Sequence, residues 1–190
     1  MKNEIIEKTV EVLRLGKTIL YPTDTIWGIG CDARNAEAVE RLYAIKGRDR
    51  SKSMLVLAGE IVKEKMMKWI GTEEEGRPTT YILPREVWQT LLGDGVVAGN
   101  IPAMDGTLGV RVPDHAFCQE VIRRLGAPLV STSANLSGRP SPAKYVEIER
   151  ELVERMDYCV PPLSEFETGE SRGSRIVRVC ADGSVEVIRA

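Results

Sequence analysis

The 190-residue sequence is poor in the residue types on which several kinds of chemistry depend. It has one histidine and four cysteines without C-x-x-C spacing, so neither a usual zinc site nor a disulfide framework is predicted. Free thiols that pack as small hydrophobic side chains are the favoured interpretation of Cys31, Cys118, Cys159 and Cys180. His115 follows a proline turn, so we expect it to be exposed and structural rather than catalytic.

Other absences exclude further classes of protein. No run is long and apolar enough to cross a bilayer, and the first sixteen residues are interrupted by glutamates, so we expect a soluble cytoplasmic protein with no membrane partner. There is no G-x-S-x-G elbow, and the glycines at 16 and 28–30 do not complete a P-loop or a dinucleotide fingerprint. A reaction driven by positioning and charge neutralisation, such as nucleotidyl transfer, is therefore favoured.

Helical and strand patterns alternate along the chain. Helices are predicted before Gly16, at 35–48, 61–70 and 115–126, and from 141–142 onward. Strands are predicted at 18–22, 53–59, 79–84, 107–113 and 128–132, with a final hairpin over 174–189 that turns at Asp182-Gly183. This order favours an α/β fold with a twisted, mixed parallel and antiparallel sheet covered by helices, in a single domain over residues 1–190.

Three segments carry candidate binding groups. Segment 20–33 has two threonines around an acid and then glycines, and is either a small-molecule cup or a turn with a core tryptophan. Segment 41–52 has five cations against one acid, and is either a solvated face or an anion site. Segment 131–142 consists mainly of hydroxyls, one amide, glycine and proline, which is more hydrogen-bonding capacity than a turn requires.

The K-x-R pair of the basic segment favours the anion site. Lys46 is a point charge and Arg48 a planar fork, which together suit a phosphate chain or a carboxylate. Both residues lie at a helix end and in a loop, where removing a solvated charge costs under about 0.5 kcal/mol. We therefore expect substitutions of Lys46 and Arg48 to leave the stability of the protein nearly unchanged.

Taken together, these segments resemble one family. Y-P-T-D-T-x-x-G-x-G-C-D-A from position 21, K-x-R followed by Lys52, T-L-G-V-R-V-P-D-H from 107 and S-T-S-A-N from 131 occur in the order and at the intervals of the YrdC-like L-threonylcarbamoyladenylate synthases. The resemblance covers about 15–189 and is to the short, single-domain form. It implies a twisted sheet with helices around a concave, positively charged cleft.

The resemblance also implies an activity. L-threonine, bicarbonate and ATP, with Mg²⁺ accompanying the ATP, would be condensed to threonylcarbamoyl-AMP and pyrophosphate, and no metal site made by the protein is predicted. The product would serve the first step of threonylcarbamoyladenosine modification of tRNA, with downstream transfer proteins as partners. The alternative is a module that holds double-stranded RNA or tRNA in the same cleft without synthase activity, which a steep salt dependence would reveal.

Individual roles follow from the same resemblance. It implies that Lys46 and Arg48 are catalytic. The implied L-threonine contacts are Thr23, Thr25, Arg111, Ser131 and Ser174. The implied ATP contacts are Arg48, Lys52, Thr107, Ser133, Asn135, Ser141 and Arg189.

Three departures from the family pattern bear on substrate preference. Leu57 stands where longer members have a histidine that contacts threonine. The stretch at 76–80 reads G-R-P-T-T instead of P-G-P-x-T, and 174–178 reads S-R-I-V-R instead of S-T-I-V-D. The change at 174–178 puts Arg175 where a small hydroxyl is expected.

Overall fold

The computed structural model describes residues 2–49, 53–70, 77–163, 172–180 and 184–190. Its strands form one nine-stranded mixed sheet in the order β7-β1-β2-β6-β3-β5-β4-β8-β9. The helices are α1 (Lys2–Arg14), α2 (Ala36–Lys46), α3 (Glu60–Ile70), α4 (Arg85–Leu92), α5 (Ala116–Leu125) and α6 (Arg150–Arg155), with a 3-10 turn at Tyr145–Glu147. The strands are β1 (Ile19–Tyr21), β2 (Gly28–Asp32), β3 (Leu55–Leu57), β4 (Thr79–Leu83), β5 (Leu108–Arg111), β6 (Leu129–Ser133), β7 (Tyr158–Cys159), β8 (Arg175–Val179) and β9 (Val185–Arg189).

The predicted α/β class and mixed sheet are confirmed. Strands β8 and β9 form the expected antiparallel hairpin, although its predicted turn at Asp182-Gly183 lies outside the described residues. Strand β2 and helix α4 were missed by the sequence pattern, and the helix expected from 141–142 begins only at Arg150 after the 3-10 turn. Strand β2 was missed because glycine disfavours strands, and its two glycines suggested a loop.

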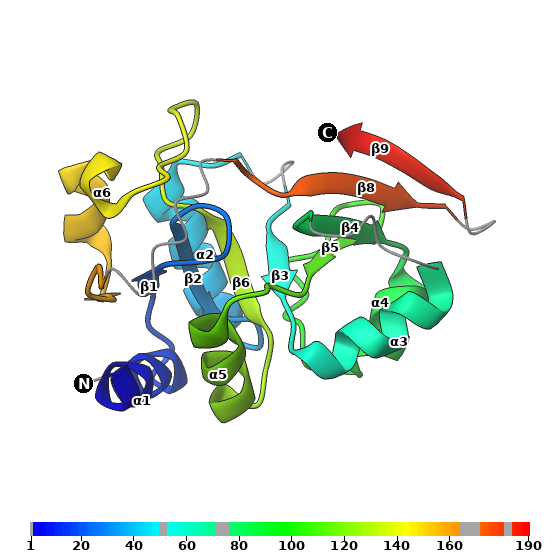
Figure 1. Cartoon of the computed structure of the whole chain (residues 1–190), viewed down its shortest axis with the longest axis horizontal. Helices are drawn as coiled ribbons and strands as arrows, with labels where there is room; N and C mark the ends of the chain where they lie inside the picture. The colour runs from blue at the N-terminus through cyan, green and yellow to red at the C-terminus, as the bar shows by residue number, and fades with distance from the viewer. Residues whose placement is uncertain (1, 50–52, 71–76, 164–171, 181–183) are drawn as a thin grey trace.

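The helices lie in separate groups against the sheet. Figure 1 shows α1 and α5 side by side below the strands β1 to β3, and α3 and α4 together near β4 and β5. In β1 the side chains of Ile19 and Tyr21 join an apolar cluster with α1 and α5, whereas Leu20 joins a second cluster with α2, α3 and α4. Because strand side chains alternate with a period of two, these clusters occupy opposite faces of the sheet.

The face that carries Tyr21 continues across the sheet as a row of paired residues. Register places the following residues opposite one another from strand to strand: Gly30, Ser131, Leu55, Gly109, Ile82 and Arg178. Paired residues point to the same face, so this row is a floor. Glycine at position 109 leaves the floor without a side chain at that point.

Gly30 is required by close packing. A Cβ at position 30 would lie 2.4 Å from the Val130 carbonyl oxygen and 3.0 Å from Cε1 of the Tyr21 ring. The backbone oxygen belongs to the neighbouring strand β6 and has no room to move without breaking the pairing of β2 with β6. The glycine that made β2 hard to predict is thus the residue that lets β1, β2 and β6 pack together.

We predict that Gly30→Ala lowers the free energy of unfolding by about 1–3 kcal/mol, because the added methyl overpacks a strand pair. Urea denaturation measures the change. Gly99→Ala is the matched control, since a Cβ there meets nothing within 4 Å, and it should stay within about 0.5 kcal/mol of the parent. Equal stability of the two variants would contradict the close-packing argument.

Candidate active site

A cavity of about 710 Å³ lies over this floor. Its walls come from the turn after β1, the loop before β3, the loop before β5, and the strands β8 and β9. Most of the site residues predicted from the sequence line it: Thr23, Thr25, Arg48, Thr107, Arg111, Ser131, Ser133, Ser141, Ser174 and Arg189. Segments that are far apart in the sequence therefore meet in one cleft.

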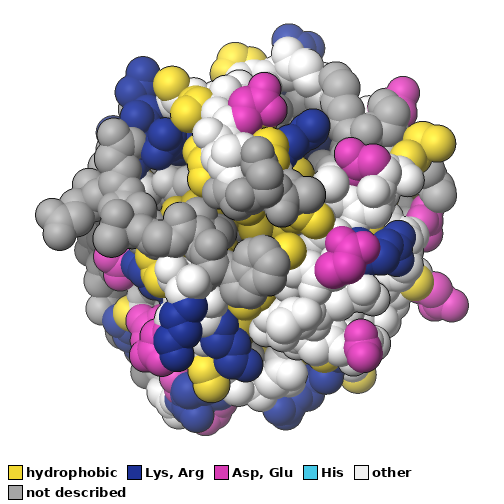
Figure 2. Space-filling model, turned by 90° about the vertical axis from the view of Figure 1, so that its right-hand side faces the viewer, with side chains coloured by type: hydrophobic (Ala, Val, Ile, Leu, Met, Phe, Trp, Pro, Cys, Tyr) yellow, Lys and Arg dark blue, Asp and Glu magenta, His cyan; other side chains and the backbone are white. Residues whose placement is uncertain are grey.

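The charged groups of the described lining are mostly cationic. Four arginines, Arg48, Arg111, Arg178 and Arg189, stand against one carboxylate, Asp105. The outer surface differs, because Figure 2 shows basic and acidic side chains interspersed over the face that it presents. The described lining thus carries more cations than carboxylates, although the chain as a whole carries a net charge of −2.

The turn after β1 is held by its own hydroxyls. Thr23 Oγ1 donates to the Ile26 carbonyl at 2.7 Å and accepts from the Thr25 amide at 3.1 Å. Since its one hydrogen is used, the contact of 3.1 Å between the two threonine hydroxyls has Thr25 as donor. Thr23 is therefore saturated within the turn, and Thr25 faces the cleft with acceptor capacity only.

Arg111 fixes the same turn from β5. Its Nη1 donates to Thr25 Oγ1 at 2.9 Å, and its Nη2 forms a buried ion pair with Asp24. Asp24 also accepts from the Asp114 amide at 3.1 Å, so the carboxylate joins both sides of the cleft. The Nε–H of Arg111 is buried without an acceptor in the described part of the chain.

Lys46 lies at the end of α2, beneath the cleft. Its ammonium donates to four oxygens within 3.2 Å: the carbonyl and hydroxyl of Ser133 and the carbonyl and side-chain oxygen of Asn135. Only 2% of Lys46 is exposed. Burial, and then the nearby charge of Arg48, lower the pKa of Lys46 to about 8. The expectation that Lys46 is a solvated charge is therefore wrong.

Asn135 and Lys46 form one buried network, and neither is among the lining residues. The amide nitrogen of Asn135 donates to the carbonyls of Leu136 and Arg139 at 3.0 and 2.6 Å. With its side-chain oxygen bound to Lys46, Asn135 organises the turn that follows β6. Arg48 does line the cleft, because Gly47 in the left-handed conformation (φ 58°) ends α2 one residue earlier.

The opposite wall is built by β4, β8 and β9. The hydroxyls of Thr80 and Ser174 are 2.7 Å apart and buried. Arg189 donates through Nε and Nη2 to the Ser174 carbonyl, which anchors the last strand at the cleft. Gly173 leaves room for this guanidinium, since a Cβ there would be 3.0 Å from Nη2.

Sequence reasoning missed several lining residues, notably Asp105, Arg178 and Thr80. Asp105 Oδ1 accepts from the hydroxyl and the amide of Thr107 at 2.7 and 3.0 Å, and these hydrogen bonds lower the pKa of Asp105. Arg178 points to the cleft because it pairs with Ile82 in the floor row. Only the parallel pairing of β4 with β8, which is not visible in the sequence, brings these strands together.

The remaining predicted positions lie elsewhere. Lys52 is outside the described residues. Leu57 is buried in the cluster with α1 and α5, and Arg175 at the start of β8 is not among the cleft residues. His115 is 8% exposed and its ring packs edge-on against Phe117, so the expectation of exposure is wrong.

The cysteines are free thiols, as the sequence predicted, although only two of them are buried. All four cysteines are free, with Cys31 and Cys118 buried and the other two half-buried. Burial raises the pKa values of Cys31 and Cys118 well above that of an ordinary thiol. No cysteine or histidine is found among the described cleft residues, so the described cleft offers no thiolate–imidazole or serine–imidazole pair.

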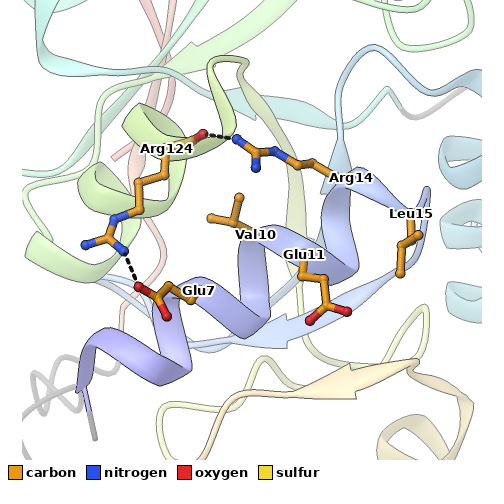
Figure 3. A pocket seen from close by; sticks show the side chains of 6 residues that line it. All are labelled: Glu7, Val10, Glu11, Arg14, Leu15 and Arg124. Atoms are coloured by element: carbon orange, nitrogen blue, oxygen red, sulfur yellow. Dashed lines mark hydrogen bonds and ion pairs between the residues drawn. The ribbon is translucent and has the colours of Figure 1, made fainter.

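A second depression, of about 490 Å³, lies between α1 and α5. Figure 3 shows two polar contacts that join the helices. Arg14 donates to the Arg124 carbonyl at 2.7 Å, and Arg124 pairs with Glu7 at 3.5 Å. Val10 supplies an apolar base. These groups are occupied in joining the two helices, and they offer no convergent set for a ligand.

In the part of the chain that the structure describes, no helix combines the length and apolarity needed to span a membrane. The same residues include no group of three or more His, Cys, Asp or Glu side chains that could hold a metal ion.

Comparison with known proteins gives consistent matches. The Sua5/YciO/YrdC family model, described as "Telomere recombination", matches residues 11–190. A protein from Pseudomonas fluorescens named threonylcarbamoyl-AMP synthase is 31% identical over 188 residues, with 95% of both chains covered. A protein of the same name from Halorhodospira halophila is 35% identical over 157 residues, with 78% of both chains covered.

Solved structures share the fold. E. coli YciO superposes with a TM-score of 0.72 at 22% identity, covering 100% of this chain and 89% of that one. P. abyssi Sua5 complexed with L-threonine has a TM-score of 0.69 at 24% identity, covering 94% of this chain and 51% of that one. At these identities the likeness concerns the fold alone.

We predict that Lys46→Ala lowers the free energy of unfolding by about 2–4 kcal/mol, because four oxygens lose their buried donor. Chemical denaturation measures the change. Lys8→Ala is the control, since Lys8 forms one exposed pair with Glu11 at 2.9 Å and should contribute about 1 kcal/mol or less. A Lys46 variant as stable as the Lys8 variant would show that the network is not a support of the fold.

Proposed function

The chain belongs to the Sua5/YciO/YrdC family, and on that premise we propose that it catalyses the ATP-dependent synthesis of threonylcarbamoyl-AMP, the product for which its curated relatives are named. The observation that carries the proposal is the cleft itself. Its described lining gathers hydroxyls and arginines from several strands and loops and includes no cysteine or histidine. Such a lining suits the alignment of anionic substrates rather than covalent catalysis.

The amino-acid end of the cleft is the part around Thr25 and Arg111. A zwitterionic amino acid needs hydrogen-bond donors for its carboxylate and an acceptor for its amine. Arg111 offers a positive charge, and Thr25 offers a lone pair. We assign L-threonine to this end, with Ser131 and Ser174 beside it and Thr23 as the support of the turn.

The triphosphate is assigned to the other arginines. Arg48 reaches the cleft through the left-handed turn at Gly47 and donates to the Ser53 carbonyl at 3.0 Å, which holds the start of the β3 segment. Ser133, Ser141, Thr107 and Arg189 supply hydroxyls and a further cation along the lining. Lys46 and Asn135 support this part of the cleft from below, because their polar groups are bound to each other and to backbone.

Mg²⁺ would enter with the nucleotide. The described cleft offers a single carboxylate, Asp105, and one of its oxygens already accepts two hydrogen bonds from Thr107. This donor set suits an ion held mainly by phosphates and water rather than by a protein cage. The ion would neutralise charge on the phosphates, while the arginines orient them.

The reaction needs two new bonds. The threonine amine bonds to the carbon of bicarbonate with loss of water, and an oxygen of the resulting carbamate bonds to the α-phosphorus of ATP while pyrophosphate leaves. Both steps join anions, so their rates depend on charge neutralisation and alignment in the cleft. The product would then pass to proteins that modify tRNA. Binding of double-stranded RNA without synthesis is the less favoured function, because the relatives are named for synthesis.

We predict that the purified protein releases pyrophosphate when supplied with ATP, Mg²⁺, bicarbonate and L-threonine, and that omission of threonine abolishes release. A coupled pyrophosphate assay measures the rate, and mass spectrometry identifies the adenylate. Pyrophosphate release that does not depend on threonine would overturn the substrate assignment. Binding of double-stranded RNA with a steep salt slope and no turnover would support the alternative.

We predict that Arg48→Ala lowers kcat about a hundredfold, because one preorganised contact to developing charge is lost. Arg139→Ala is the matched control, since its side chain is 69% exposed and is not among the cleft residues, and it should keep full activity. If both variants were as active as the parent, Arg48 would belong to a solvated face and not to the site.

Arg111→Lys separates charge from geometry. A lysine keeps the positive charge but loses the planar fork. With that fork, one guanidinium can bond Thr25, Asp24 and a ligand together. We predict that the KM for L-threonine rises about tenfold or more while the KM for ATP changes little, a ratio that corresponds to the loss of one good hydrogen bond. Equal rises in both constants would place Arg111 outside the threonine end.

A further inference from the structure

Tyr21 is buried beside the cleft with its hydroxyl aimed at one partner. None of its surface is exposed, and its hydroxyl donates to Ser131 Oγ at 2.7 Å. Ser131 lies on the floor row and lines the cavity, whereas Tyr21 does not. Tyr21 is thus packed with α1 and α5 on the same face of the sheet and touches the site through a single hydroxyl.

Tyr21 is the donor in this pair, which determines what the Ser131 hydroxyl has left for another partner. A serine hydroxyl has one hydrogen and two lone pairs, and one lone pair of Ser131 accepts the tyrosine hydrogen. The Ser131 hydrogen itself has no acceptor in the described part of the chain. Burial raises the pKa of Tyr21, so its hydroxyl keeps its hydrogen across the physiological range. Ser131 is therefore left with a hydrogen that only a molecule in the cleft can accept.

Two glycines make this arrangement possible. A Cβ at Gly30 would lie 3.0 Å from Cε1 of the Tyr21 ring, and a Cβ at Gly28 would lie 3.4 Å from Ser131 Oγ. Both glycines belong to β2, the strand between β1 and β6. Without side chains at these positions, the ring of Tyr21 crosses β2 and reaches the hydroxyl on β6.

We propose that Tyr21 is a positioning residue that holds the Ser131 hydroxyl as a hydrogen-bond donor to an anionic oxygen of the amino-acid substrate. The proposal rests on the proposed function, since it takes the threonine end of the cleft as given. Without the tyrosine hydroxyl, Ser131 would be free to rotate and one of its lone pairs would be left without a donor.

The donor role of Ser131 complements its neighbours. Thr25 has only acceptor capacity towards the cleft, and Arg111 Nε–H is a donor without a partner in the described chain. Ser131 adds a hydrogen that can be donated to an anionic oxygen, while Thr25 offers an acceptor and Arg111 a positive charge. Together these groups match a carboxylate and an amine.

The test is a double-mutant cycle of Tyr21→Phe and Ser131→Ala, with L-threonine binding measured by calorimetry and both KM values measured by pyrophosphate release. We expect Tyr21→Phe to weaken threonine binding about tenfold with an unchanged KM for ATP. In the Ser131→Ala background the same change should have no further effect on threonine, because Tyr21 acts through Ser131. In the Ser131→Ala background, Tyr21→Phe should raise the melting temperature, because it removes a buried hydroxyl that has lost its partner.

Tyr158→Phe is the matched control. Tyr158 on β7 also bonds a hydroxyl side chain, that of Thr9, and lies outside the cleft residues. It should leave threonine binding and both KM values as in the parent. A Tyr21→Phe variant that binds threonine like the parent, or that weakens both substrates equally, would overturn the positioning role.

The same experiment separates two kinds of failure. If the parent binds no L-threonine and releases no pyrophosphate, the proposed function fails and the role of Tyr21 fails with it. If the parent binds and turns over threonine while Tyr21→Phe adds its full effect on top of Ser131→Ala, the function stands. In that case only the coupling of Tyr21 to Ser131 is overturned.

Discussion

The buried ammonium of Lys46 joins the two halves of the cleft. It ties the end of α2 to the turn after β6 through oxygens of Ser133 and Asn135. A buried charge is tolerated only when such bonds compensate its lost hydration, and here backbone carbonyls supply two of them. Gly47 and Arg48 follow directly, and Ser133 carries its hydroxyl to the cleft wall. The position of both groups therefore depends on a residue that does not itself line the cavity.

The cleft also depends on a part of one sheet face that α1 and α5 do not cover. On that face α1 and α5 pack over Ile19, Tyr21 and Leu57, whereas Ser131, Leu55, Gly109 and Ile82 line the cavity. A helix over this part would need a continuous set of large apolar side chains on the floor to pack against. Ser131 and Gly109 interrupt the apolar side chains of Leu55 and Ile82, and a hollow remains there.

Much of this could be read from the sequence, because local patterns determine local structure. The hairpin of β8 and β9, the helix α2 with its Asn35 cap, and the hydroxyl-rich turn after β6 were all visible in the chain. Strand β2 was not, because its glycines are required by a neighbour 100 residues away, at Val130. Likewise, the burial of Lys46 is set by contacts with Asn135, and nothing in a helix-end pattern distinguishes a solvated lysine from an enclosed one.

A cluster of hydroxyls in a sequence does not show which of them binds a ligand. Thr23, Thr25 and Ser131 look alike in the chain, yet the structure gives each a different remaining capacity. Thr23 has none left, Thr25 has one lone pair, and Ser131 has one hydrogen and one lone pair. The difference arises from hydrogen bonds within the protein, such as those with the Ile26 carbonyl and the hydroxyl of Tyr21. Substrate orientation in such a site is thus decided by the partners that each lining hydroxyl already has, because they determine whether it can still donate or accept.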